Sequence, residues 1–337
     1  MSASASKEIL LTREGYLRAL DVLARRSPFE AIPMSLPEAE IPLKSMPVLS
    51  VGVGSTASVA SFLTHCLSSR SSRSCRFISQ DELGIMEELV CGHVVILISA
   101  SGAHPWTIGA ITAVTDNGAC PYVVTLDPSS AAPASIRRAG VGAVVAPQTS
   151  RYAQEHIAGE NIAALIELIS AWISGPEEAK HVSDAFFQGL STSRVDNEDF
   201  FVGSTRIVLL HDFHGQTAAQ DFACRCREVN LLPVTQVYFR DFVHGSSTVA
   251  RAQGGGDRPV VLAFVQTALA AELRSLFSAN AGEVKALITT VSDTSPKEIA
   301  RGLGVSIGLH SMLVSQLAID WAICQWNVGA KLWEKHR

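Results

Sequence analysis

The sequence predicts an α/β protein built from two consecutive, doubly wound parallel sheets that are flanked by helices. Short apolar runs rich in β-branched residues, such as Val94–Ile98, are typical of strands buried on both faces, as parallel sheets require. Each run is followed by a short polar turn and then by an apolar-periodic segment of helical length. The same order recurs about 155 residues later, an offset that suits a second α/β domain and is too long for a solenoid repeat.

Length and composition fit this prediction. The chain has 337 residues, is 47% apolar and 18% charged, and has a mean hydropathy of +0.23, which is typical of a well-buried globular protein. Its net charge of −5 and the lack of a basic stripe argue against nucleic acid as a partner. The late apolar segment Val305–Cys324 contains His310 and Asp320, so we expect a core helix and no membrane span.

Cysteine usage indicates the compartment. The chain contains seven cysteines, an odd number, and its first residues lack the apolar core of a signal peptide. We therefore expect reduced thiols and a cytoplasmic protein.

The first half of the chain contains most of the predicted elements. Thr12 is expected to cap a helix that runs to about Arg26, and the proline-rich residues 28–47 are expected to form an extended linker. The elements expected after the linker are strands at 48–51, 76–78, 94–98 and 122–126, an apolar run at 141–146, and helices at 57–67, from 81, at 106–114 and at 157–173.

The second half repeats this order. We expect a strand at 206–210, a helix that runs through about Glu228, and further strands at 259–265 and 284–290. The expected domains are an N-terminal helix and linker (1–45), a first α/β domain (46–175), a connecting helix or linker (176–202), and a second α/β domain with a C-terminal helix and tail (203–337).

A candidate anion site follows the strand at 94–98. The segment Ser99-Ala100-Ser101-Gly102 lies between this strand and the next helix. Two hydroxyls and free backbone N–H groups therefore meet the positive end of a helix dipole, which favours a bound anion. An ordinary polar turn would give the same pattern, so this segment alone leaves both interpretations open.

A second turn extends the pattern into a resemblance. Gly54-Ser55-Thr56 follows the strand at 48–51, and Ser99–His104 follows the strand at 94–98. This arrangement resembles the sugar isomerase (SIS) domain family, whose turns read Gly-Thr-Ser and Ser-Gln-Ser-Gly-Glu-Thr and cradle a sugar phosphate. The resemblance implies two tandem flavodoxin-like domains and a sugar-phosphate site at Gly54, Ser55, Thr56, Ser99, Ala100, Ser101 and His104.

The second half adds candidate catalytic residues to this resemblance. The family places a catalytic glutamate on the helix after the first strand of its second domain, and a His-Gly pair sixteen residues later. Here Glu228 ends the corresponding helix, and His244-Gly245 follow sixteen residues on. In the family, the glutamate moves a proton and the histidine opens the sugar ring from the neighbouring subunit of a homodimer. A lysine near the C-terminus closes the site, and Lys331 or Lys335 matches it.

The resemblance therefore implies a phosphosugar isomerase, or an amino-sugar-phosphate deaminase or deglycase, that acts on a hexose 6-phosphate. Family members that the sequence resembles include the isomerase module of glucosamine-6-phosphate synthase, the fructosamine-6-phosphate deglycases and the amino-sugar-phosphate deaminases. The residues before 46 are too few for the glutaminase domain of the synthase. We expect no cofactor, and no metal, because His211-x-x-His214 has no evident third ligand.

Two other functions stay open at this stage. A non-catalytic sugar-phosphate sensor could use the same fold, and His104, in place of the family's threonine, favours it. An NAD-binding oxidoreductase would explain Gly52-x-Gly54-x-x-Ala57 with Asp81 near the ribose distance. That fingerprint leaves the Ser-x-Ser-Gly segment and the second half unexplained.

Overall fold

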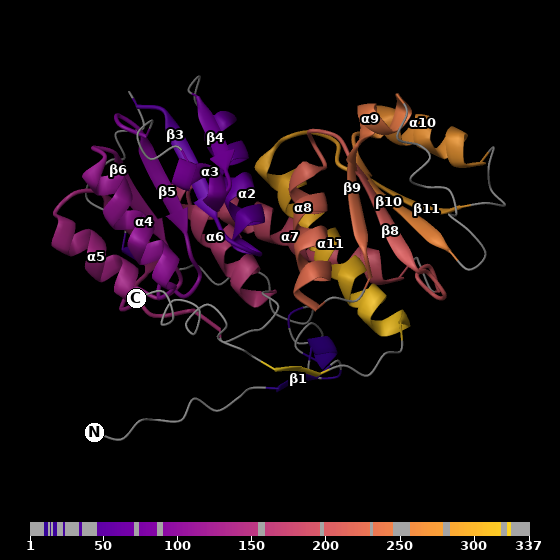
Figure 1. Ribbon diagram of the computed structural model, residues 1–337, viewed down its shortest axis with the longest axis horizontal. Helices are drawn as coiled ribbons and strands as arrows, with labels where there is room; N and C mark the ends of the chain where they lie inside the picture. The colour runs from indigo at the N-terminus through magenta and orange to yellow at the C-terminus, as the bar shows by residue number, and fades with distance from the viewer. Residues whose placement is uncertain are drawn as a thin grey trace.

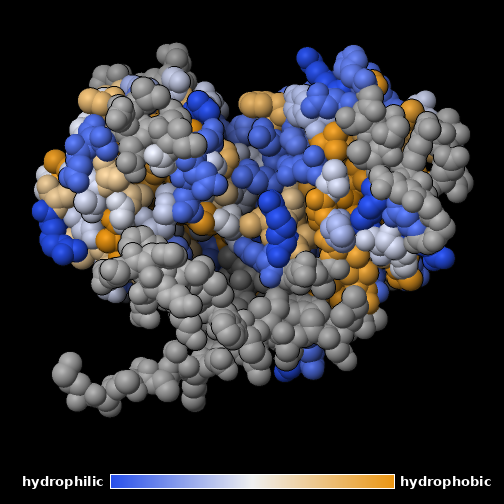
Figure 2. Space-filling model, viewed as in Figure 1, coloured by the Kyte–Doolittle hydropathy of each residue, from blue (hydrophilic) through white to orange (hydrophobic). Residues whose placement is uncertain are grey.

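The computed structural model describes residues 10–12, 14, 16–18, 23, 34–35, 46–70, 74–85, 90–153, 159–195, 199–229, 232–244, 257–278, 284–317 and 322–324. The structure contains the two helix-flanked parallel sheets that the sequence predicts, and they lie on either side of a central group of helices (Figure 1). On the face shown in Figure 2 the surface is notched between the two halves, and hydrophilic residues gather at this notch. No helix within the described ranges is long and apolar enough to cross a membrane.

The first sheet has six strands in the order β2-β7-β6-β5-β3-β4, all parallel except the edge strand β2. Every residue of the neighbouring strands β3 and β5 is buried, which confirms the sequence prediction for Val94–Ile98. The strands are β2 (Met34–Ser35), β3 (Val48–Gly52), β4 (Cys75–Ile78), β5 (Val94–Ile98), β6 (Cys120–Val124) and β7 (Ala143–Pro147).

Helices cover both faces of this sheet because successive side chains of a strand point to opposite faces. Val94 and Ile96 pack with residues of α2 and α6, whereas Val95 and Leu97 pack with residues of α4 and α5. The helices of this half are α2 (Thr56–Ser68), α3 (Gln80–Ile85), α4 (Pro105–Asp116), α5 (Ala131–Ala139) and α6 (Glu160–Ser174).

The second sheet has four parallel strands in the order β11-β10-β8-β9. This order matches β6-β5-β3-β4 of the first sheet, so α8 follows β8 as α2 follows β3. The elements of this half are β8 (Arg206–His211), α8 (Gln216–Val229), β9 (Val234–Tyr238), α9 (Phe239–Val243), β10 (Pro259–Val265), α10 (Thr267–Ser278) and β11 (Lys285–Thr290).

Two long helices, α7 (Pro176–Val195) and α11 (Pro296–Gln316), join the halves. α7 packs on α6 of the first half, and α11 packs on α8 of the second and also contacts α2. The two helices touch each other backbone to backbone, because a Cβ at Gly304 would overlap the carbonyl oxygen of Phe186 and one at Gly189 would overlap that of Arg301.

The two ends of the chain differ from the prediction. α11 ends at Gln316, and Ala322–Cys324 form a strand, β12, so the expected helix over 305–324 is wrong at its C-terminal end. β12 pairs antiparallel with β1 (Leu10–Thr12), so Thr12 lies in a strand and does not cap a helix. The sequence prediction is wrong here because β1 and β12 form only by pairing with each other. Each strand is three residues long, and its partner lies at the other end of the chain. Helical residues do follow at 14, 16–18 and 23.

Candidate functional site

The two serine-rich turns lie side by side at the carboxyl ends of β3 and β5. These strands are hydrogen-bonded neighbours, with Gly52 opposite Ile98. The Thr56 hydroxyl lies 2.9 Å from the carbonyl oxygen of Val53 and 3.1 Å from that of Ile98. Thr56 therefore ties the first turn to the end of β5, so the two turns start next to each other at the carboxyl ends of these strands.

Glycine gives both turns the same backbone conformation. Gly54 and Gly102 each have a φ of +58°, in the left-handed region that other residues avoid. A Cβ at Gly102 would also lie 2.8 Å from the Thr125 hydroxyl oxygen. The turns are therefore built alike, each placing a serine-containing loop at the start of a helix.

The side chains of the second turn have distinct roles. Ser99 is buried, and its Oγ accepts a hydrogen bond from the Gly102 N–H at 3.2 Å. Ser101 is half-buried and accepts from the Ala103 N–H at 3.3 Å. His104 is exposed and caps α4, because its Nδ1 accepts from the Trp106 N–H at 3.2 Å. Both serines keep a hydroxyl hydrogen that can be donated to an anion.

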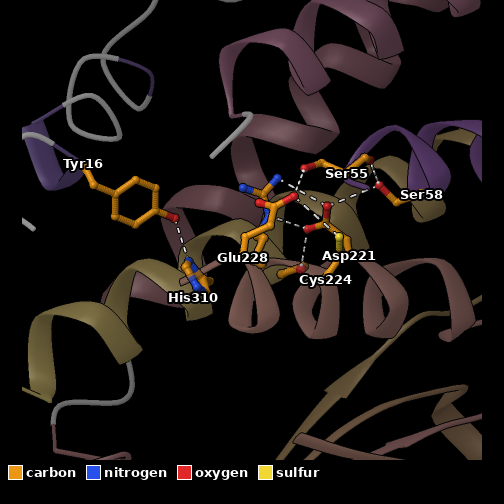
Figure 3. A network of polar contacts seen from close by, with 9 residues as sticks. Tyr16, Ser55, Ser58, Asp221, Cys224, Glu228 and His310 are labelled. Carbon is orange, nitrogen blue, oxygen red and sulfur yellow. Dashed lines mark hydrogen bonds and ion pairs between the residues drawn. The ribbon is translucent and has the colours of Figure 1, made fainter. Parts of the chain in front are cut away.

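Glu228, at the end of α8, reaches the first of these turns (Figure 3). Ser55, the residue before α2, donates a 2.8 Å hydrogen bond from its Oγ to Glu228 Oε1, although the two residues are 173 positions apart in the sequence. α2 and α8 pack antiparallel, so the C-terminal end of α8 lies beside the N-terminal end of α2. The structure thus brings Glu228 together with Gly54 and Ser55, as the sequence predicts.

The surroundings of Glu228 change its acidity. The side chain keeps contact with solvent, yet the protein around it removes enough water to raise the pKa of its carboxyl. The positive charge of Arg225 and the hydrogen bond from Ser55 oppose this shift. Cys224 Sγ lies 3.6 Å from Glu228 Oε1, and burial followed by the Glu228 charge raises the pKa of Cys224 to about 12. The thiol is therefore neutral at physiological pH.

A buried polar network underlies Glu228 and was not predicted from the sequence. Asp221 and Arg225, one turn apart on α8, form an ion pair of 2.7 Å with no exposed side-chain surface. Ser58 of α2 and Ser306 of α11 both donate hydrogen bonds to Asp221, at 3.2 and 2.7 Å. The network fixes α8 against both helices, so it holds Glu228 in position.

The network extends to the N-terminal segment. The Tyr16 hydroxyl lies 2.7 Å from His310 Nδ1 of α11, and both side chains are buried (Figure 3). The only sequence signal for these buried charges is the spacing Asp221-x-x-x-Arg225, which usually indicates a surface pair on a helix. Nothing in the sequence places this pair in the core.

His244 lies elsewhere in the protomer. It caps the C-terminal end of α9, which follows the carboxyl end of β9. α8 instead runs about 20 Å along the sheet to its opposite end, where Glu228 lies. The structure records no contact between His244 and Glu228 in the parts of the chain that it describes. Gly245, Lys331 and Lys335 lie outside the described residues.

His211, the last residue of β8, and His214, in the turn that follows, both lie close to oxygen atoms of Asp212. His211 Nδ1 lies 3.2 Å from the Asp212 carbonyl oxygen, and His214 Nδ1 lies 3.7 Å from the Asp212 carboxylate. Asp212 accepts hydrogen bonds from the N–H groups of Gly215 and Gln266, both at 2.8 Å, and so ties β8 to β10. Among the described residues, no three His, Cys, Asp or Glu side chains are grouped as metal ligands.

No family model matches the chain, and no curated protein matches it. Solved structures do match it over nearly its full length. A tagatose-6-phosphate ketose/aldose isomerase from Escherichia coli is 16% identical with a TM-score of 0.66, and 90% of each chain is covered. A glucosamine-6-phosphate deaminase from Thermotoga maritima is 13% identical with a TM-score of 0.66, covering 91% of this chain and 95% of its own.

A third match is the C-terminal domain of glucosamine-fructose-6-phosphate aminotransferase from Francisella tularensis. It is 12% identical with a TM-score of 0.59, covering 90% of this chain and 93% of its own. At these identities the likeness shows the fold. The matched structures include phosphosugar isomerases and deaminases, the class of protein that the sequence resembles.

Proposed function

We propose that this protein is a phosphosugar isomerase, or an amino-sugar-phosphate deaminase or deglycase, that acts on a hexose 6-phosphate. The observation that carries the proposal is the hydrogen bond between Ser55 and Glu228. It supports the proposal because a carboxylate of raised pKa lies beside the first of two neighbouring turns, both of which suit a phosphate group. A substrate held by its phosphate would then present its carbon chain near a base.

Glu228 is the proposed general base. Aldose–ketose conversion moves a proton between adjacent carbons, C1 and C2, of the open-chain sugar. A carboxylate whose pKa lies nearer to the working pH takes up and returns that proton more effectively. Deamination and deglycation of an amino-sugar phosphate begin from the same kind of proton transfer, so the site supports all three reactions.

Ser99 and Ser101 are the proposed phosphate ligands, together with the backbone of Gly54, Ala100 and the start of α2. In this proposal His244 of a second subunit opens the sugar ring, and Lys331 closes the site. Support for these two roles comes from the sequence resemblance. A homodimer is therefore part of the proposal, because His244 and Glu228 lie at opposite ends of the second sheet.

The function is tested by proton exchange. Fructose, glucosamine, galactosamine and fructoselysine 6-phosphates are incubated with the protein in deuterated water, and deuterium entry at C1 and C2 is followed by NMR. We expect exchange with at least one of them, and a loss of about 10²–10⁴ in rate for Glu228→Gln. Glu272→Gln, at an exposed glutamate of α10, is the matched control and should keep the wild-type rate. Binding without any exchange by the wild-type protein would contradict the enzyme proposal.

The shared site is tested by mixing subunits. Glu228→Ala and His244→Ala are each expected to be inactive alone, and hybrid dimers of the two should regain part of the activity, since one of their two sites is intact. A protein that sediments as a monomer at working concentration would contradict the shared site.

A sugar-phosphate sensor is the second candidate, and one observation favours it. The His104 ring caps its own helix, where the family has a threonine hydroxyl for the phosphate. A sensor would bind a hexose phosphate and gain thermal stability from it without turnover. The exchange experiment separates the two candidates.

A further inference from the structure

A cavity lies at the other end of the α2–α8 pair from Glu228. Its volume is about 360 Å³, which lies within the usual range for small-molecule sites. It is lined by the C-terminal part of α2, by β4, by the turn before α8 and by the residues before α11. None of the residues of the candidate site lines it.

In the second half, the cavity lies at the counterpart of the place where the turn before α2 meets Glu228. Because α2 and α8 are antiparallel and follow corresponding strands, exchanging the two halves exchanges the two ends of this helix pair. At one end Glu228 lies beside the turn that starts α2. At the other end His65, in the last turn of α2, contacts Phe213 in the turn that starts α8, with ring centroids 5.6 Å apart. The cavity lies at this second meeting point.

The lining has the chemistry of a site for a hydroxylated anion. It offers hydroxyls from Thr64, Ser68 and Thr294 and the amide of Gln216, which is the first residue of α8. Its ionisable groups include Arg76 and His65, and none of the described residues that line it carries a carboxylate. The N-terminal end of α8 adds the positive end of a helix dipole.

Two features shape what can bind. The side chain of Arg76 also forms a 2.9 Å ion pair with Glu82, which holds the guanidinium at the rim. Phe213 is 56% exposed, which is unusual for a large aromatic residue and leaves a ring face free to pack against the carbon face of a sugar. Its exposure has no role in the candidate site around Glu228.

We propose that this cavity is a second binding site for a sugar phosphate, separate from the site at Glu228. The phosphate binds near Arg76 and the start of α8, and the hydroxyls of the sugar bind the α2 hydroxyls. A ligand here contacts both α2 and α8, the helices that also carry Ser55 and Glu228. It therefore stabilises the packing of α2 against α8, on which the site at Glu228 depends. Binding of a sugar phosphate in the cavity does not require that Glu228 be catalytic.

Two cysteines make the sites separable in one experiment. Cys75 lines this cavity, and Cys224 lies beside Glu228, while the exposed Cys91 belongs to neither. The protein is labelled with N-ethylmaleimide for increasing times, alone and with fructose 6-phosphate, glucose 1-phosphate or inorganic phosphate, and each cysteine is quantified by peptide mass spectrometry. We expect one of the sugar phosphates to slow labelling of Cys75 in proportion to occupancy, with Cys91 unaffected.

Two substitutions separate direct from remote protection. Ser68→Trp, at an exposed rim position, fills the cavity and should abolish protection of Cys75. Ser191→Trp, at an exposed position of α7, is its control and should leave protection intact. Arg76→Gln should weaken ligand binding, read from protection of Cys75, by about tenfold or more, as for a lost charge-assisted hydrogen bond. Arg18→Gln also breaks a surface ion pair with a glutamate and should leave the binding unchanged.

The outcomes distinguish this proposal from the proposed function. Protection of Cys224 without protection of Cys75 would overturn the second site and leave the first intact. Protection of Cys75 that survives Ser68→Trp would mean that a remote change shields it, and would also overturn the second site. Protection of Cys75 alone would support the second site, and the deuterium-exchange experiment would then decide the first.

Discussion

The hydroxyl of Ser55 donates a 2.8 Å hydrogen bond to the carboxylate of Glu228, across the junction of the two sheets. The proposed base therefore belongs to one half of the molecule, and the group that orients it belongs to the other. Any change that shifts α2 against α8 changes both the direction and the acidity of this carboxylate.

Removal of this hydrogen bond should move the pH profile of the reaction. The bond favours the charged carboxylate, so Ser55→Ala should raise the pKa of Glu228 further above its ordinary value. Activity that needs the charged form should then begin at a higher pH than in the wild-type protein. The pH dependence of kcat/KM measures this. Ser61→Ala, which removes a contact with Thr217 on the same pair of helices, should leave the profile in place. An unchanged profile for Ser55→Ala would contradict the assignment of Glu228 as the base.

Glu228→Gln should stabilise the protein at neutral pH while abolishing turnover. Desolvation raises the pKa of Glu228 in the folded state, so the folded protein holds this proton more tightly than the unfolded chain does. The contribution of Glu228 to stability is therefore full below its ordinary pKa of about 4.5 and decreases as the pH rises through the raised value. Thermal unfolding at several pH values should show a higher Tm for Glu228→Gln at pH 7 and no gain at pH 4. A lower Tm at pH 7 would indicate that the carboxylate is structural.

Breaking the buried ion pair should be costly. Arg225→Met leaves the Asp221 carboxylate buried without its cation, and a cost of about 3–5 kcal/mol in the free energy of unfolding is expected. Replacing both partners, Asp221→Leu with Arg225→Met, should recover much of this loss. The control is Arg18→Met, which removes an exposed pair of the same i, i+4 spacing and should cost at most about 0.5 kcal/mol. Urea unfolding measures all three, and a small effect of Arg225→Met would show that the pair is not buried in solution.

His310 should make the protein sensitive to acid. Burial, aided by the charge of Arg225, lowers the pKa of His310 to about 3. Between pH 6.5 and pH 3, His310 is therefore protonated in the unfolded chain but stays neutral in the folded protein. The contribution of the neutral His310 to the free energy of unfolding is complete above pH 6.5 and is lost as the pH falls. His310→Gln should flatten the pH dependence of the unfolding free energy in this range. His181→Gln, at an exposed histidine of α7, should not.

The two serines of the second turn should differ in their effects. Ser101→Ala should weaken sugar-phosphate affinity by about 1–2 kcal/mol, the value of a hydrogen bond to a charged group, with little change in Tm. Ser99→Ala should weaken affinity similarly and also lower the Tm, because Ser99 is buried and its Oγ holds the Gly102 N–H. Calorimetric titration and thermal unfolding of the free protein separate these effects. An unchanged ligand-induced Tm shift in the double variant would place the phosphate elsewhere.

Local patterns were enough to predict the sheets and the two turns. The β-branched run Val94–Ile98 and the Ser-x-Ser-Gly segment after it carry their structure in neighbouring residues, and the spacing of Glu228 within its half gave its place on α8. The buried residues that hold Glu228 in position could not be predicted from local sequence. Asp221 and Arg225 have the composition of an exposed helix face, and their burial depends on Ser58 and Ser306, which lie on other helices.

The two ends of the chain also make contacts that local sequence patterns do not predict. The apolar composition of 305–324 fits a long helix, and only the pairing of β12 with β1 makes its last residues a strand. Tyr16 likewise meets His310 across 294 positions, a contact that no local periodicity encodes. Long-range pairing of short segments is the part of this structure that sequence patterns did not contain.

The glycine contact between α7 and α11 limits how the molecule can move. Two-lobed proteins can move by hinge bending at a few loop residues, or by shear, in which packed helices slide past each other over a layer of side chains. At Gly189 and Gly304 no such layer exists, and the carbonyl groups of one helix lie against the Cα atoms of the other. Sliding of α7 along α11 is therefore disfavoured, so the two halves keep their relative position along this contact.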